Sequence, residues 1–146
     1  AARDGRVLAL VADASAPPLA TTFDAVLVDA PCSGLGTLRA HPEIRWRRTP
    51  EDLEHLAARQ EAILARAADL VRPGGRLVYA TCTVARAENE RVVERFLASR
   101  ADFRLGDARP HLPEPARTLA GDDGMLRTSP DVGGLDGFFA ARLERR

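Results

Sequence analysis

The sequence predicts an α/β fold in which strands and helices alternate around one sheet. Short apolar runs end at polar residues, an amphipathic helical pattern separates two of these runs, and glycine and proline mark the breaks. Such alternation is typical of a doubly wound α/β sheet. The 146 residues fit a single domain, and no internal repeat or second domain is evident. We therefore treat 1–146 as one unit.

Apolar runs of six to eight residues are expected to form the main strands. Two of them end at or beside an aspartate, Asp13 after the first run and Asp29 after the second. Continuous apolar strands of this length are typical of a sheet that is covered on both faces. The expected strands are residues 6–13, 23–28, 76–81 and 137–143, with 101–105 as a further candidate.

Two amphipathic segments are expected to form helices. The first covers residues 49–71, where a capping threonine and a proline begin the helix and Arg-Pro-Gly-Gly ends it. The second covers residues 85–99, with Val92, Val93 and Phe96 on its inner face. Residues 106–135 are rich in proline and glycine and are expected to form loops.

Composition and charge narrow the class of protein. The 21 basic residues, all arginine, balance 21 acidic ones, so no global attraction to nucleic acid is expected. No apolar run approaches the ~18 residues of a membrane span, and no signal-peptide pattern occurs. We therefore expect a cytoplasmic protein without membrane association. One local basic patch stands out, Arg39–Arg48, with four arginines, a histidine and Trp46.

The two cysteines, Cys32 and Cys82, both directly follow a strand pattern. Ligands of doubly wound sheets bind outside the carboxyl ends of the strands, so both thiols are expected at one crevice with Asp13 and Asp29. Most free cysteines are small buried hydrophobes, and structural disulfides are unusual in the cytoplasm. Without a CxxC pair or a histidine cluster, no metal site is expected. Two thiols at one crevice therefore favour a chemical role.

The segment VDAPCSGLGTLRAHPEIRW, followed by GGRLVYATCT, resembles the paired signature of the RNA cytosine-5 methyltransferases of the Sun (RsmB) family. The closing SPDVGGLDGFFAARLER is similar to that family's final strand, and the resemblance covers residues 7–145. It implies a Rossmann-like class I methyltransferase fold and S-adenosylmethionine as the methyl donor. It also implies ribosomal RNA as the partner, with 16S rRNA as the expected target.

The resemblance also assigns roles to the site residues. Cys82 would be the nucleophile that adds to the cytosine ring, and Cys32 would assist release of the methylated product. Asp29 would hold the base edge near the donor methyl. Asp13 resembles the residue that contacts the donor's adenosine, although a plain turn aspartate is the alternative. DNA cytosine-5 enzymes carry their nucleophile in a Pro-Cys element, which would make Cys32 the attacking thiol; we prefer Cys82 because residues 33–36 and HPEIRW match the RNA family.

A second group of residues would face the RNA on this hypothesis. Arginines commonly contact phosphates, aromatic rings stack on bases, and the target base must be flipped or unpaired to reach a thiol. The alternative is that Trp46 belongs to the core and the arginines form a solvated face. The expected RNA-facing residues are Pro31, Arg39, His41, Arg45 and Trp46, with Arg47 and Arg48 beside them.

The sequence departs from the family pattern in one major respect. The glycine-rich donor loop and the first two strands of the usual fold are missing, so the chain resembles the C-terminal portion of a catalytic domain. We expect an unpaired sheet edge, an exposed apolar surface and little or no donor binding by this chain alone. The alternative function is an RNA-binding module on the same fold without catalysis. The sequence does not indicate an oligomeric state.

Overall fold

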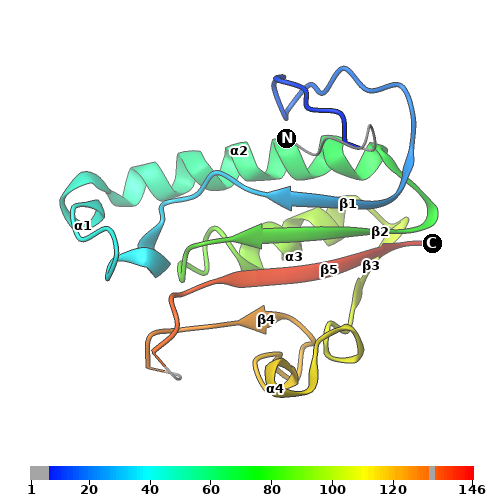
Figure 1. Cartoon of the computed structure of the whole chain (residues 1–146). Helices are drawn as coiled ribbons and strands as arrows, with labels where there is room; N and C mark the ends of the chain where they lie inside the picture. The colour runs from blue at the N-terminus through cyan, green and yellow to red at the C-terminus, as the bar shows by residue number, and fades with distance from the viewer. Residues whose placement is uncertain (1–6, 132–133) are drawn as a thin grey trace.

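The computed structural model describes residues 7–131 and 134–146, which form a mixed five-stranded sheet with helices packed against it (Figure 1). The strands are β1 (Phe23–Asp29), β2 (Val71–Thr81), β3 (Phe103–Gly106), β4 (Leu126–Arg127) and β5 (Phe139–Arg145). The helices are α1 (Ile44–Arg47), α2 (Pro50–Asp69), α3 (Glu90–Ser99) and α4 (Glu114–Arg117), with 3-10 turns η1 (Leu35–Thr37) and η2 (Arg109–His111). No helix in these described ranges is long and apolar enough to cross a membrane.

The order of the strands brings three loops to one edge of the sheet. The path is β1-β2-β5-β3, and the short β4 also pairs with β5. β1 and β2 run parallel, whereas β5 is antiparallel to β2, with Thr81 opposite Phe139. The carboxyl ends of β1 and β2 therefore meet the start of β5. In Figure 1 the arrowheads of β1 and β2 point to this edge, and α1 lies just beyond it.

The core lies between the sheet and the two long helices. Alternate residues of β2 and β5, including Leu77 and Leu143, are fully buried and pair across the two strands. They share one cluster with Leu64 of α2 and Phe96 of α3. Burial of each such side chain stabilises the fold by about 1.5–3 kcal/mol. Because α2 and α3 also contact each other, both cover the same face of the sheet.

The other face of the sheet carries no long helix in the described residues. Leu27 of β1 points to this face and is 68% exposed. The expectation of a sheet covered on both faces is therefore wrong for this part of the chain. The expected unpaired edge and exposed apolar surface are confirmed, because β1 pairs only with β2 among the described residues. An apolar strand pattern thus reports which residues are suited to burial and does not show that a covering layer is present.

The predicted helix at 49–71 is confirmed as α2. Thr49 accepts a hydrogen bond from the backbone N–H of Asp52, and the Asp52 carboxylate accepts one from the backbone N–H of Thr49. Such a capping box satisfies backbone donors that the first helical turn leaves free, and Pro50 stands where no donor is needed. Local chemistry alone therefore determines where this helix begins.

The predicted first strand is wrong. Residues 7–13 form no strand, Leu8 is 89% exposed and Val11 fully so; Arg6 lies outside the described residues. A strand needs a neighbour to satisfy its backbone groups, and none of the described strands pairs with this segment. The segment instead runs as irregular chain near α2 (Figure 1), and Ala14 and Pro17, which follow it, line a cavity with residues of β1 and α2.

Other predicted boundaries differ by a few residues. β2 begins at Val71 and not at 76, because Val71 pairs with Phe23 before the ladder shifts register. β3 and β5 lie close to their predicted positions. The predicted loop 106–135 contains η2, α4 and β4, all of which are short. α3 begins at Glu90 and not at 85, since the residues before it bind the neighbouring loops.

Candidate active site

The edge of the sheet brings the two cysteines together, as the sequence predicts. The sulfur of Cys32, three residues after β1, lies 3.3 Å from the sulfur of Cys82, directly after β2. Both are free thiols and partly buried, and either can donate the S–H···S hydrogen bond. Two segments that are fifty residues apart in the chain thus place two nucleophilic groups in direct contact.

Backbone hydrogen bonds of Gly36 join the two cysteine loops to the residues just before β5. Its backbone N–H donates to the Cys82 carbonyl at 3.1 Å, and its own carbonyl accepts from the Gly137 N–H at 2.8 Å. A Cβ at position 36 would lie 1.9 Å from the Gly137 oxygen and 2.9 Å from the Cys82 oxygen. Only glycine allows the three loops to approach so closely.

A buried carboxylate anchors the loop that carries Cys32. Glu88 is fully buried, and its Oε2 accepts from the Ser33 backbone N–H at 2.8 Å and from Gln60 Nε2 at 2.9 Å. Gln60, also fully buried, donates in addition to the Pro31 carbonyl at 2.9 Å. The residues on both sides of Cys32 are therefore fixed by side chains from α2 and from the turn after β2.

Further buried hydrogen bonds fix the loop that carries Cys82. The Ser33 and Thr83 hydroxyls lie 2.8 Å apart, and Asn89 Nδ2 donates to the Thr83 carbonyl at 2.9 Å. Thr81 donates to Asn89 Oδ1 at 2.6 Å. Because Asn89 is committed to these contacts, the chain turns through residues 86–89 before α3 begins. These bonds explain the late start of α3, and they fix the Cys82 loop against the Cys32 loop.

Burial raises the pKa of the Cys32 thiol to about 12, and its hydrogen bond with Cys82 acts in the same direction. A thiol with so high a pKa keeps its proton near neutral pH. The geometry allows either thiol to donate the sulfur–sulfur hydrogen bond.

The two predicted aspartates take no part in the hydrogen bonds that hold the cysteine loops. Asp29 is the exposed last residue of β1 and lines a cavity of ≈ 230 Å³ with Leu27 and Pro31. Asp13 is exposed and does not end a strand; its carboxylate accepts from the side chain and backbone of Ser15, which lower its pKa. The neighbouring Ala14 lines the same cavity as Asp29. The roles predicted for both aspartates remain predictions.

The basic segment 39–48 flanks the cysteine edge. Trp46 is 84% exposed, so the alternative that it belongs to the core is wrong. Arg48 donates through Nε to the Ser33 carbonyl at 3.1 Å, which ties the segment to the cysteine loop. Arg39 lies 3.4 Å from Asp136, and Arg45 and His41 are exposed. The segment that carries this exposed aromatic ring is therefore joined to the loop of Cys32.

The sequence interpretation missed the residues that hold the site together. Gln60 and Glu88 received no role, although each makes one hydrogen bond to the loop of Cys32 and a third bond joins the two side chains. One signal was available in the helix pattern. Gln60 stands between Ala57 and Leu64 on the apolar face of α2, where a glutamine needs a buried partner. The identity of that partner, 28 residues away, was not visible in the sequence.

The fold and this site define a class: an α/β sheet of the Rossmann-like methyltransferase type with two thiols at the carboxyl edge of its strands. The family model described as 16S rRNA methyltransferase RsmB/F matches residues 4–144. The chain therefore belongs to the RsmB/F family of 16S rRNA methyltransferases, which confirms the resemblance drawn from the sequence.

Curated relatives agree with this assignment. The ribosomal RNA small subunit methyltransferase B of Thermus thermophilus is 47% identical over 120 residues, which cover 82% of this chain and 29% of that protein. The protein of the same name from Shewanella oneidensis is 38% identical over 121 residues, which cover 83% of this chain and 27% of that protein. The chain thus spans between a quarter and a third of the length of these relatives.

Solved structures share the fold. The crystal structure of PH0851 superposes with a TM-score of 0.75 at 38% identity, covering 84% of this chain and 26% of that one. NSun6 from Pyrococcus horikoshii, solved with SFG, also gives a TM-score of 0.75, at 31% identity, covering 93% of this chain and 34% of that one. The architecture predicted from the sequence is therefore that of known methyltransferase structures.

Proposed function

We propose that these residues carry the catalytic thiols of an enzyme that methylates carbon 5 of a cytosine in ribosomal RNA, expected to be 16S rRNA, in the cytoplasm. The main support is the contact of two free thiols, 3.3 Å apart, at the sheet edge where ligands of such folds bind. The family match and the names of the relatives support RNA as the substrate class.

S-adenosylmethionine is the proposed methyl donor, and the described residues fit part of it. The cavity beside Asp29 measures ≈ 230 Å³, which is below the roughly 300–1,000 Å³ of pockets that enclose a whole small molecule. Asp29 and Asp13 are the acidic groups that would hold the donor here. When bound, the donor supplies an electrophilic methyl group. The NSun6 structure with SFG, an analogue of this donor, supports the choice.

Cys82 is the proposed nucleophile. Carbon 5 of cytosine is too weak a nucleophile to accept a methyl group unaided. Addition of the Cys82 thiolate to carbon 6 forms a carbon–sulfur bond and moves an electron pair toward carbon 5, which would then take the methyl group as the sulfur–methyl bond of the donor breaks and a neutral thioether leaves. The hydrogen bonds around Thr83 and Asn89 would hold this sulfur in place throughout the reaction.

Cys32 is proposed to assist release of the product. After methylation a general base takes the proton from carbon 5, the carbon–sulfur bond breaks, and Cys82 leaves as a thiolate. The protonated Cys32, at 3.3 Å, can donate a hydrogen bond to that leaving thiolate. Without this donor elimination should slow, so that the covalent adduct accumulates.

The exposed groups beside the thiols are proposed to receive the RNA. Trp46 can stack on a base and Arg45 can contact phosphate, while Arg39, His41 and Pro31 complete this side of the edge. A base must leave its helix to reach the thiols, because both sulfurs are partly buried. The hydrogen bonds of Glu88 would keep the loop of Cys32 in place while the base enters.

Adduct trapping tests these roles in the full-length gene product. Wild type, Cys32→Ala and Cys82→Ala are incubated with ribosomal RNA and donor, and SDS-stable protein–RNA conjugates are resolved by electrophoresis. We expect Cys32→Ala to accumulate the conjugate and Cys82→Ala to form none. The double variant is the matched control and should also form none.

The other outcomes separate the alternatives. A conjugate in Cys82→Ala but not in Cys32→Ala would make Cys32 the nucleophile. If no variant traps RNA while binding persists, the covalent mechanism is wrong and an RNA-binding module without catalysis is the better description.

A further inference from the structure

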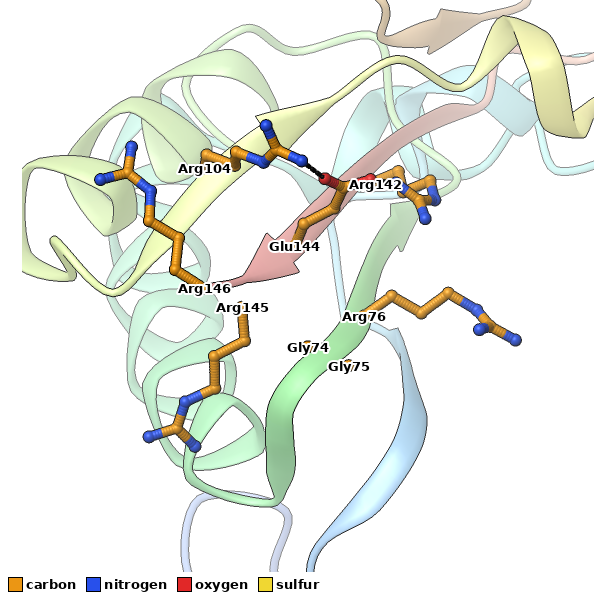
Figure 2. Close-up of a pocket in the computed structure, with 8 residues that line it drawn as sticks. All are labelled: Gly74, Gly75, Arg76, Arg104, Arg142, Glu144, Arg145 and Arg146. Atoms are coloured by element: carbon orange, nitrogen blue, oxygen red, sulfur yellow. Dashed lines mark hydrogen bonds and ion pairs between the residues drawn. The ribbon is translucent and has the colours of Figure 1, made fainter.

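A group of arginines lies at the end of the sheet opposite the cysteines (Figure 2). They surround a cavity of ≈ 380 Å³ at the start of β2 and the end of β5. Of the eight residues that line this cavity, five are arginines and one is acidic. The lining residues are Gly74, Gly75, Arg76, Arg104, Arg142, Glu144, Arg145 and Arg146.

The pairing of β2, β3 and β5 places most of these arginines side by side on the face of the sheet without long helices. Arg76 of β2 and Arg104 of β3 both stand opposite Glu144 of β5. Arg142 lies two residues before Glu144, so it points to the same face. Position 106, opposite Arg142, is a glycine, and a Cβ there would lie 2.6 Å from the Arg142 guanidinium. The missing side chain makes room for the charged pair.

Acidic partners do not balance these arginines. The Glu144 carboxylate accepts from Arg142 and lies 2.6 Å from Arg104, and the Arg142 hydrogen bond is the main cause of its lowered pKa. Arg145 lies 3.2 Å from Asp102, which also binds Arg100. No carboxylate of the described residues lies within 4.0 Å of Arg76 or Arg146, so the cavity keeps an excess of positive charge.

The arrangement suits a chain of charges better than a single anion. Figure 2 shows Arg104 directed toward Glu144, whereas Arg76, Arg145 and Arg146 extend in different directions around the bare strand at Gly74 and Gly75. A compact phosphate site would have its guanidinium groups aimed at one point. Guanidinium groups spread over a surface match the repeated phosphates of a nucleic acid backbone.

We propose that this arginine surface, residues 76, 104, 142 and 146, binds the phosphodiester backbone of the RNA whose target base enters the cysteine site; Arg145 is excluded because it points to the opposite face and donates to the Val71 carbonyl at 2.6 Å. The inference rests on the proposed function, since it takes the substrate to be RNA. Cys82 lies six positions after Arg76, which is a distance of about 20 Å along a strand. Contacts so far from the target base add affinity and orientation without reading its sequence.

Salt-dependent RNA binding by the full-length protein tests the proposal. Arg76→Gln/Arg146→Gln removes the two arginines that lack carboxylate partners among the described residues, so no ion pair is broken. Arg59→Gln/Arg91→Gln, on the exposed sides of α2 and α3, is the matched control, because it makes the same change in charge and neither arginine has a carboxylate partner among the described residues. Fluorescence anisotropy measures Kd across salt concentrations with two labelled RNAs, one long enough to span the ~20 Å between the two sites and one too short.

We expect the arginine-surface variant to bind the long RNA several-fold more weakly at low salt. The slope of log K against log salt should become shallower by about 0.7 for each lost contact with single-stranded RNA. Binding of the short RNA and the behaviour of the control variant should not change. An unchanged slope would overturn the proposal. A lowered unfolding midpoint with unchanged RNA affinity would also overturn it, because the two arginines would then contribute to stability and not to RNA binding.

Failure of the proposed function gives a different result. The adduct would be absent from Cys32→Ala while the arginine-surface variant still weakens binding of the long RNA. The position of the RNA backbone and the chemistry at the thiols are therefore tested separately.

Discussion

The cysteine edge of the sheet and the segment 7–22 show opposite outcomes of similar sequence patterns. Both contain apolar runs that end at an aspartate. At the cysteine edge the run became β1, and side chains from α2 and the turn after β2 fix the loop that follows. In the segment 7–22, Leu8 and Val11 are exposed and no strand forms. An apolar run thus becomes ordered structure only where partners far away in the sequence meet it.

The largest effect should come from filling the space at Gly36. In Gly36→Ala the Cβ would lie 1.9 Å from the Gly137 carbonyl oxygen, so backbone must move at the point that joins both cysteine loops to β5. We expect the free energy of unfolding, measured in urea, to fall by at least about 2 kcal/mol. Gly74→Ala is the control: its Cβ meets nothing, and only the left-handed backbone adds a cost, about 1 kcal/mol. Equal losses of stability in the two variants would show that the close backbone approach at Gly36 is not what Gly36→Ala disrupts.

Removal of the buried carboxylate should have the next largest effect. Glu88→Ala leaves the Ser33 N–H and one Gln60 N–H without their acceptor, at a cost of about 2 kcal/mol in the free energy of unfolding. Glu88→Gln keeps an oxygen acceptor and should lose less. Urea denaturation would measure both, with the exposed Glu54→Ala expected to change little. If Glu54→Ala lost as much unfolding free energy as Glu88→Ala, the hydrogen bonds of the buried Glu88 would not explain its effect.

The pH dependence of alkylation should report the surroundings of Cys32. Burial first, and then the Cys82 hydrogen bond, raise the pKa of Cys32 from 9.0 to about 12. Alkylation of Cys32 by iodoacetamide, followed by mass spectrometry, should therefore still accelerate above pH 10. It should be faster in Cys82→Ala, where one cause of the shift is gone. A plateau near pH 9 in the wild type would show that the site does not protect this proton.

The same shift has a consequence for stability. The folded state binds the Cys32 proton more tightly than the unfolded state does. The Cys32 proton therefore adds to the free energy of unfolding in full below about pH 9, and this contribution is lost as the pH rises toward 12. Wild type should therefore lose stability in this range relative to Cys32→Ala, as followed by urea denaturation at each pH.

The smallest effect should come from the exposed segment. Leu8 is 89% exposed, so Leu8→Asp should change the free energy of unfolding by less than about 0.5 kcal/mol. Leu64, fully buried between the helices and the sheet, is the contrast, and Leu64→Ala should cost about 2–5 kcal/mol. A loss above ~1 kcal/mol for Leu8→Asp would mean that the segment packs in solution.

The features that the sequence predicted correctly depend on nearby residues. The capping residues of α2, the strands that became β1 and β2, and the place of each cysteine after a strand are all visible within a few positions. The convergence of Cys32 and Cys82 follows from the parallel pairing of those two strands. Family resemblance added the chemical roles, which adduct trapping would test.

The features that were missed depend on distant residues. The late start of α3 reflects bonds from Asn89 to Thr81 and Thr83, and those bonds matter only once the cysteine loops are packed. Glu88 meets Ser33 across 55 positions, and no local pattern indicates that pairing. The failed strand at 7–13 has the same cause, since pairing is decided by neighbours and not by the run itself.

The place of β5 in the sheet affects how the chain folds as it is synthesised. β5 follows β2, β3 and β4 in sequence, yet it pairs with all three. While a ribosome makes this chain, β3 and β4 have no strand to pair with until residues 139–145 emerge from the exit tunnel. Among the described strands only β1 and β2 can pair early, so closure of the sheet and arrival of Gly137 at Gly36 both wait for late-made residues. A premature stop before Phe139 would therefore leave β1–β2 and β3 unjoined, with the cysteine loops held by Gln60 and Glu88 but not tied to β5.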